Sequence, residues 1–102
     1  MGTLHYGASR TSIQIDDRAL AHLQTVITTK LRRNEGLLVQ WERPVETGSG
    51  RGSFWIHPHC DLIYEYDGSR TPALDPAELD RLMIEAAGTH GIKITSEQRI
   101  AA

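Results

Sequence analysis

The segment from Ile15 to Gly36 constrains the fold most, because it combines a helix start, an apolar stripe and a basic helix end. Asp16 can accept hydrogen bonds from the first N–H groups of a helix, and Ile15 and Leu20 occupy the positions of a hydrophobic staple. At about 100° per residue, one narrow arc of this helix is apolar: Leu20, Leu23, Ile27 and Leu31. We therefore predict an amphipathic helix that begins after Asp16, ends near Arg33 and packs this arc against a core.

The opposite arc of the same helix is polar, and we expect it to face water: Arg18, His22, Thr25, Thr29, Arg32 and Arg33. Lys30, Arg32 and Arg33 stand in the last turn, where positive charge complements the negative end of the helix dipole. Residues 17–33 contain four Lys and Arg against one acid, whereas residues 61–81 contain six acids against two arginines. This distribution predicts a polarised molecule with a local basic patch.

Apolar and polar side chains alternate on both sides of this helix, which is typical of half-buried strands. We expect strands at residues 3–6, 11–15, 37–42, 53–57, 62–66 and 92–95. Residues 44–52 are rich in Gly and Pro and predict a mobile connection between antiparallel strands. A second helix should follow Asp75 and Pro76, with Glu78 completing a capping box and with an apolar stripe formed by Leu79, Leu82, Met83 and Ala86.

This order of elements, ββαβββαβ, predicts the α+β class. We expect a single two-layer domain over residues 1–95, with one mostly antiparallel sheet and both helices covering one of its faces. The remaining residues, 96–102, form the expected frayed C-terminal tail.

Composition limits the classes of function. The chain has 102 residues and a formal net charge of −2, so it fits one domain and has no global positive field that would attract phosphate backbones. The single cysteine, Cys60, cannot form an internal disulfide, which favours a reducing cytoplasmic location. No signal peptide is evident and no segment approaches the roughly 20 apolar residues that span a bilayer, so we expect no membrane association.

Binding to DNA or RNA would therefore have to be local, and the basic residues provide one candidate surface. Arg51 in the glycine-rich segment could join the basic end of the helix, and an outward Trp55 or Trp41 could stack on a base. The candidate contact residues for a nucleic acid or another anion are Arg18, Lys30, Arg32, Arg33, Arg51 and Trp55. The same cations are also explained as a solubilising surface that satisfies helix carbonyls.

Two other interpretations remain open at this stage. A homodimer or a docked protein partner would cover apolar surface that a small two-layer core leaves exposed. A small metal-dependent enzyme would use His57, His59 and Cys60, although no second pair of ligands at zinc spacing accompanies them. The Gly48–Gly52 segment is not a P-loop, because it lacks the Lys-Ser/Thr ending and precedes a strand.

Motifs distributed along the chain also carry a family resemblance: Asp16–Leu23, Lys30–Arg33, Gly50-Arg51, Trp55–Pro58 and Asp67–Arg70 with Pro72. From Met1 to about Ile94 the sequence resembles a family of short uncharacterised actinobacterial proteins, whose members are often labelled ATP-dependent DNA ligase. The resemblance implies no established activity.

The ligase label does not agree with the chemistry of these residues. A ligase requires a lysine in a Lys-x-Asp-Gly context, and Glu65 stands in that position before the one Asp-Gly pair, Asp67-Gly68. His59 and Cys60 also stand where the resembling proteins tend to have small or aliphatic residues, which argues against a family-wide role for Cys60. We therefore expect a non-enzymatic binding or accessory module without a cofactor.

Overall fold

The computed structural model describes residues 2–8, 11–43 and 50–94. Its elements are β1 (Gly2–Tyr6), β2 (Thr11–Ile15), α1 (Asp17–Arg32), β3 (Leu37–Arg43), β4 (Gly50–Ile56), β5 (Leu62–Tyr66), α2 (Pro76–Ala87) and β6 (Ile92–Ile94). This ββαβββαβ order confirms the predicted α+β class. The expected tail at residues 96–102 lies outside the described residues.

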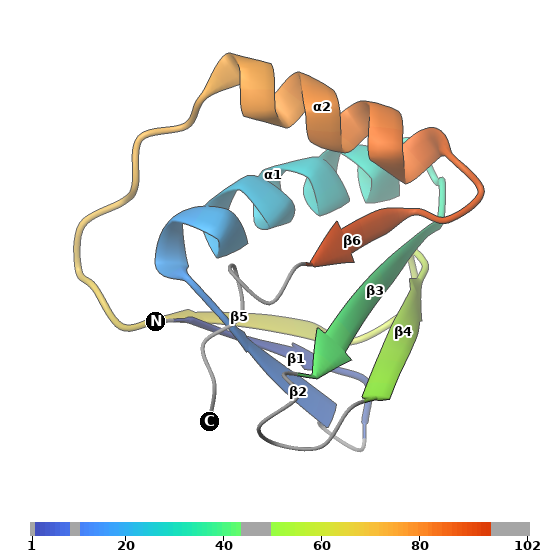
Figure 1. The fold of residues 1–102 in the computed structure, drawn as a ribbon, viewed down its shortest axis with the longest axis horizontal. Coiled ribbons are helices and arrows are strands. Elements are labelled where there is room, and N and C mark those ends of the chain that lie inside the picture. The colour runs from blue at the N-terminus through green and yellow to red at the C-terminus, as the bar shows by residue number, and fades with distance from the viewer. Residues whose placement is uncertain (1, 9–10, 44–49, 95–102) are drawn as a thin grey trace.

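The strands form two three-stranded sheets rather than the single sheet expected (Figure 1). In the first sheet the order is β2-β1-β5, and both of its pairings are antiparallel. In the second sheet the order is β4-β3-β6, with β3 antiparallel to β4 and parallel to β6. Each sheet is a local hairpin extended by one distant strand, and the period of a strand does not specify which distant neighbour it will join.

The two helices also differ from the expectation that both cover one face of one sheet. α1 contacts β1 and β5 of the first sheet, whereas α2 contacts β3 and β6 of the second sheet and packs beside α1 (Figure 1). The core lies between these layers and includes the predicted stripe residues Leu20, Leu23 and Ile27. Neither described helix combines the length and the apolar run that a helical membrane span needs.

The predicted start of α1 is confirmed. A carboxylate oxygen of Asp16 accepts a hydrogen bond from the backbone N–H of Ala19 at 3.1 Å, and the staple residues Ile15 and Leu20 are buried. The polar arc is different from the prediction at one position, because His22 is fully buried rather than exposed to water. α2 packs over this part of α1, and helical periodicity alone does not show that a second element covers a polar residue.

The end of α1 is a sharp reversal of the chain. Asn34 adopts a left-handed conformation with φ of 59°, and its backbone N–H donates to the carbonyl of Leu31. The N–H of Glu35 donates to the carbonyl of Lys30, which completes a Schellman motif. This reversal brings the chain from the basic helix end directly into β3.

The β3–β4 hairpin extends further than the sequence predicts. β4 begins at Gly50, so Gly50–Gly52 belong to a strand and not to the connection. Gly52 pairs with Trp41, and a Cβ at Gly52 would collide with the indole ring of Trp41, which lies across it. Residues 44–49 of the predicted mobile connection lie outside the described residues.

Candidate functional site

Arg18 is committed to an ion pair at the start of α1. Its Nη1 donates to Oε2 of Glu78 at 2.9 Å, and its Nη2 lies 3.9 Å from Oδ2 of Asp75. Both carboxylates come from the beginning of α2, so Arg18 joins the two helices. A phosphate at Arg18 would have to compete with these two carboxylates.

Lys30 is also engaged. Its side chain is largely buried in the last turn of α1, and its Nζ lies 3.6 Å from Oε1 of Glu35. The Schellman turn places Glu35 beside the helix end, which explains this pairing. Lys30 therefore supports the turn and presents little charge to a ligand.

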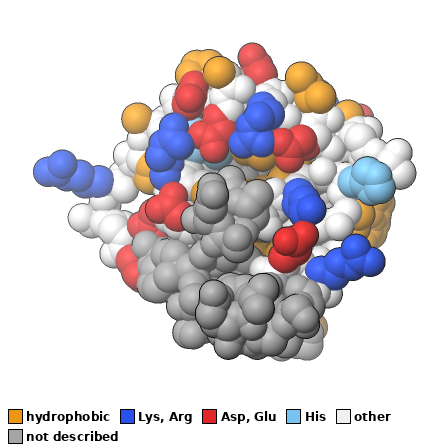
Figure 2. Space-filling view, in the orientation of Figure 1, with side chains coloured by type: hydrophobic (Ala, Val, Ile, Leu, Met, Phe, Trp, Pro, Cys, Tyr) orange, Lys and Arg blue, Asp and Glu red, His pale blue; other side chains and the backbone are white. Residues whose placement is uncertain are grey.

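The predicted contact residues do not form one continuous basic surface. Arg18 and Arg32 stand at opposite ends of α1, about 21 Å apart at 1.5 Å per residue. Arg51 is exposed on β4 and stands opposite Glu42 in the β3–β4 ladder. On the face shown in Figure 2, Lys and Arg side chains alternate with Asp and Glu side chains. The expected polarisation is thus not seen on this face.

Three of the predicted residues do share one end of the molecule. Arg32 and Arg33 are exposed at the end of α1 and make no ion pair within the described residues. Trp55 is 59% exposed on β4, and a Cβ at Gly36 would lie 2.7 Å from Cζ2 of its indole ring. The indole therefore lies against the bare backbone of Gly36, immediately after the turn that follows Arg33. We call this surface, made of Arg32, Arg33, Gly36 and Trp55, the indole end.

The backbone also fixes the position of Trp55. Trp55 pairs with Leu38 in the β3–β4 ladder. The backbone carbonyl of Trp55 accepts a hydrogen bond from the hydroxyl of Tyr6 in the first sheet. Its neighbours Phe54 and Ile56 are buried, so alternation along the strand directs the indole away from the core. The strand thus holds an aromatic ring at the surface on a rigid support.

The predicted metal-ligand candidates lie in the turn after β4. The rings of His57 and His59 are 6.4 Å apart between centroids, and Nδ1 of His57 accepts a hydrogen bond from the backbone N–H of His59. Cys60 donates its backbone N–H to the carbonyl of His57 and has a free, half-buried thiol. Among the described residues, no three His, Cys, Asp or Glu side chains are grouped so that they could hold a metal ion.

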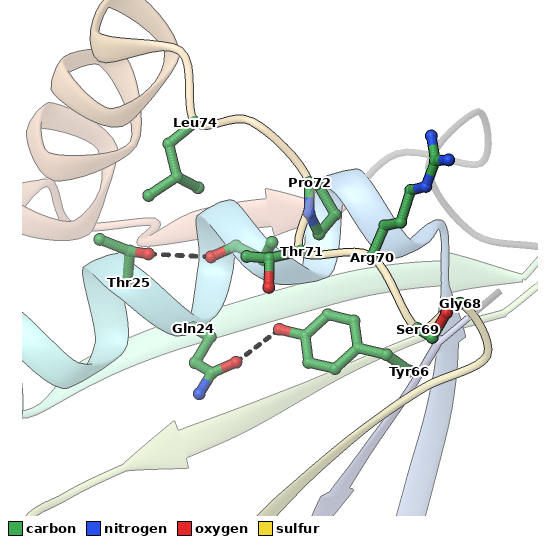
Figure 3. Close-up of a pocket in the computed structure, with 10 residues that line it drawn as sticks. Gln24, Thr25, Tyr66, Gly68, Ser69, Arg70, Thr71, Pro72 and Leu74 are labelled. Carbon is green, nitrogen blue, oxygen red and sulfur yellow. Dashed lines mark hydrogen bonds between the residues drawn. The ribbon is translucent and has the colours of Figure 1, made fainter.

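A surface pocket of about 460 Å³ lies elsewhere, between α1 and the connection from β5 to α2 (Figure 3). Its walls are Ala21, Gln24 and Thr25 of α1, Tyr66 of β5, and Gly68, Ser69, Arg70, Thr71, Pro72 and Leu74. We call residues 68–75 the strap. Sequence reasoning did not find this pocket, because Gln24 and Thr25 look like ordinary solvent-facing residues of a helix.

Two side chains of α1 hold the two ends of the strap. The carboxylate of Asp17 accepts a hydrogen bond from the N–H of Gly68 at 3.0 Å, and this bond lowers the pKa of Asp17 below its usual value. At the other end, Nε2 of His22 accepts from the N–H of Asp75 at 2.9 Å. No backbone–backbone hydrogen bond involves residues 69–74 within the described chain. The strap is therefore anchored at its ends and crosses the pocket between them.

Large exposed apolar side chains are distributed over several elements. Among the described residues they are Trp55 on β4, Ile63 on β5, Leu74 on the strap and Ile84 on α2. Each comes from a different element, and isolated apolar residues of this kind are common at protein surfaces. The distribution does not single out a surface for a second copy of the chain.

Comparison with known proteins adds the family. The family described as "Domain of unknown function (DUF7882)" matches residues 1–97, which is nearly the whole chain. The chain belongs to this family. No curated protein and no solved structure matches it.

Proposed function

We propose that this DUF7882 protein is a non-enzymatic module that binds single-stranded nucleic acid through the indole end. The observation that supports the proposal is the exposed indole of Trp55 on Gly36, which follows Arg33 by three residues, and Arg32 and Arg33 make no ion pair within the described residues. Proteins that bind single strands combine aromatic platforms for the bases with cations for the backbone. The indole end contains both.

The small number of unpaired arginines and the exposed indole together favour a single strand over a duplex. Among the predicted cations of α1, Arg32 and Arg33 alone make no ion pair within the described residues, because Arg18 and Lys30 are engaged by carboxylates. Arg51 lies on the same strand face as Trp55 but about 13 Å away, since four residues of a strand separate them. A duplex hides its bases from Trp55, so that stacking, which is worth about 1–3 kcal/mol per base, would be lost.

Few cations also imply a modest dependence on salt. The logarithm of the binding constant falls with the logarithm of salt concentration by about 0.7 for each phosphate neutralised on a single strand. Two arginines therefore predict a slope of about −1.4, much shallower than the slope of a strongly basic protein. A measured slope near this value would correspond to two neutralised phosphates, and the R32Q/R33Q variant tests whether these two arginines account for them.

The test is fluorescence anisotropy with labelled single-stranded oligo-dT and oligo-U and with a duplex of equal length, at several salt concentrations. We expect single strands to bind at low salt, and Trp55→Ala to weaken binding about ten-fold. The double variant R32Q/R33Q should weaken binding and flatten the salt dependence. Arg81→Gln is the control, because Arg81 is an exposed arginine on α2 and belongs neither to the indole end nor to the strap pocket.

The contradicting outcomes are equally definite. Absence of binding to any of these oligonucleotides at low salt would reject the proposal. Binding that survives both Trp55→Ala and R32Q/R33Q unchanged would reject the indole end as the contact surface. Tighter binding to the duplex than to single strands would reject base stacking on Trp55.

A further inference from the structure

The strap pocket differs from the indole end in its position, its lining and its chemistry. It lies over the middle of α1, which contributes Ala21, Gln24 and Thr25. The indole end follows the last turn of the same helix, so the two surfaces share no residue. A ligand of the strap pocket is therefore independent of the proposed binding of nucleic acid.

Hydrogen bonds within the pocket orient Gln24. The hydroxyl of Tyr66 donates to Oε1 of Gln24, so the amide oxygen is occupied and the amide nitrogen points away from Tyr66 (Figure 3). The hydroxyl of Thr25 also has a partner within the chain, because it donates to the backbone carbonyl of Ala21 at 3.0 Å. The side-chain amide nitrogen of Gln24 has no partner among the described residues. It is a donor held in a fixed direction.

The strap contributes two hydroxyl groups and one guanidinium to the lining of the pocket, and it contributes no carboxylate. The hydroxyls of Ser69 and Thr71 make no hydrogen bond within the described chain. Arg70 extends from the strap into solvent at the edge of the pocket and makes no ion pair there (Figure 3). Its guanidinium is the one charged group among the ten described lining residues. The ten described lining residues therefore contribute one positive charge and no carboxylate.

Apolar surface completes the lining. The aromatic ring of Tyr66 forms one wall, and Leu74, which is 44% exposed, lies across the pocket from it with Pro72 between them in the strap (Figure 3). Small-molecule sites are typically of this kind, with apolar walls and a few polar groups that fix the orientation of the ligand. The volume of about 460 Å³ is within the usual range for such sites.

From this lining we infer that the strap pocket binds a small organic anion with a flat apolar body. The body packs against Tyr66 and Leu74, and the anionic group accepts hydrogen bonds from Gln24 and Thr71. Arg70, whose long exposed side chain can turn over the opening, supplies the opposite charge. A carboxylate and a phosphate monoester share this chemistry, and the experiment distinguishes them.

The test is titration of the ¹⁵N-labelled protein with three aromatic probes, observed by heteronuclear NMR. Benzoate carries a carboxylate, phenyl phosphate carries a phosphate, and benzamide has the same ring without a charge. We expect at least one of the two anions at millimolar concentration to shift the side-chain amide signal of Gln24 and the backbone signal of Thr71. The tighter of the two identifies the preferred anionic group, and benzamide should bind at least ten-fold more weakly.

Two substitutions connect any binding to the named groups. Arg70→Gln should weaken the anion about ten-fold, as expected for the loss of one charge-assisted contact. Gln24→Glu keeps an oxygen that can accept from Tyr66 but replaces the donor with a negative charge, so it should abolish anion binding. Arg81→Gln is the control, because Arg81 is an exposed arginine on α2 that lines neither the strap pocket nor the indole end.

The inference is overturned if neither anion shifts the signals of the lining residues. It is also overturned if Arg70→Gln and Gln24→Glu, with well-dispersed spectra, bind the anion as the unmodified chain does. Benzamide binding as tightly as the anions would refute the assignment of charge. These outcomes do not depend on the oligonucleotide experiments, so either proposal can fail alone.

Discussion

The Nε2 atom of His22 accepts a hydrogen bond from the backbone N–H of Asp75 at 2.9 Å, so a side chain of α1 caps the beginning of α2. The sequence predicted that Glu78 would take this place in a capping box. Glu78 instead pairs with Arg18, while Nδ1 of His22 lies 2.7 Å from the carbonyl of Arg18. A buried imidazole thereby connects the two helices and one end of the strap.

Replacing His22 should therefore destabilise the fold. In His22→Ala the N–H of Asp75 loses its acceptor and a fully buried side chain leaves a cavity, which together cost about 2–4 kcal/mol. Urea unfolding measures the change in the free energy of unfolding. His59→Ala is the control, because His59 is exposed and its loss should cost less than about 0.5 kcal/mol. Equal stability of the two variants would contradict the role of His22.

Substitutions at two glycines with positive φ should distinguish the energetic cost of backbone strain from the cost of a steric clash between a new Cβ atom and the neighbouring backbone. Gly7 has φ of 78° with nothing near its absent Cβ, whereas Gly91 has φ of 66° and a Cβ there would overlap the carbonyl of Leu38. Gly7→Ala should cost about 1 kcal/mol from strain alone. Gly91→Ala should cost more than about 3 kcal/mol, because β6 would have to move away from β3. Thermal or urea unfolding compares them, and similar losses would refute the collision.

The tyrosines should ionise at higher pH in the folded protein than in the unfolded chain. Burial raises the pKa of Tyr6, Tyr64 and Tyr66 above the usual value of 10.0, and these are the three tyrosines of the chain. The folded state then holds protons that the unfolded state releases. The contribution of these tyrosines to the free energy of unfolding is fully present below about pH 10 and is lost as pH rises through the raised pKa values.

Ultraviolet absorbance of the phenolate measures this ionisation. At pH 10 we expect less phenolate in the folded protein than in an unfolded control, which is about half ionised. Tyr64→Phe should reduce the alkaline loss of stability, since Tyr64 is the tyrosine most strongly shifted by burial. Ordinary titration of all three tyrosines in the folded protein would contradict this expectation.

Arg18 and Arg33 should differ in their effects on oligonucleotide binding. Arg18 is engaged by Glu78, so Arg18→Gln should leave binding unchanged and cost at most about 1 kcal/mol of stability, as is usual for a half-exposed ion pair. Arg33→Gln should weaken binding several-fold and make the salt slope shallower by about 0.7. Anisotropy at two salt concentrations measures both quantities. An equal loss from the two substitutions would show that the indole end is not the contact surface.

Several local features could be predicted from the sequence because neighbouring residues decide them. Asp16 caps α1 and Asp75 caps α2 through their own carboxylates. The alternation in β3 correctly separates buried Leu37 and Val39 from the other face. The outward direction of Trp55 follows from the same alternation in β4. These outcomes depend on the periods of helices and strands and on the first backbone N–H groups of each helix, which need an acceptor.

Only the tertiary structure decided which distant residues meet. Segments more than 50 residues apart are joined where β3 pairs with β6 and where Arg18 pairs with Glu78. The packing of α2 on α1 also buries His22. The same long-range packing reduced the predicted basic surface to the indole end and created the strap pocket. Local periodicity fixes what each element is, but the partners of its side chains depend on contacts that no short stretch of the chain encodes.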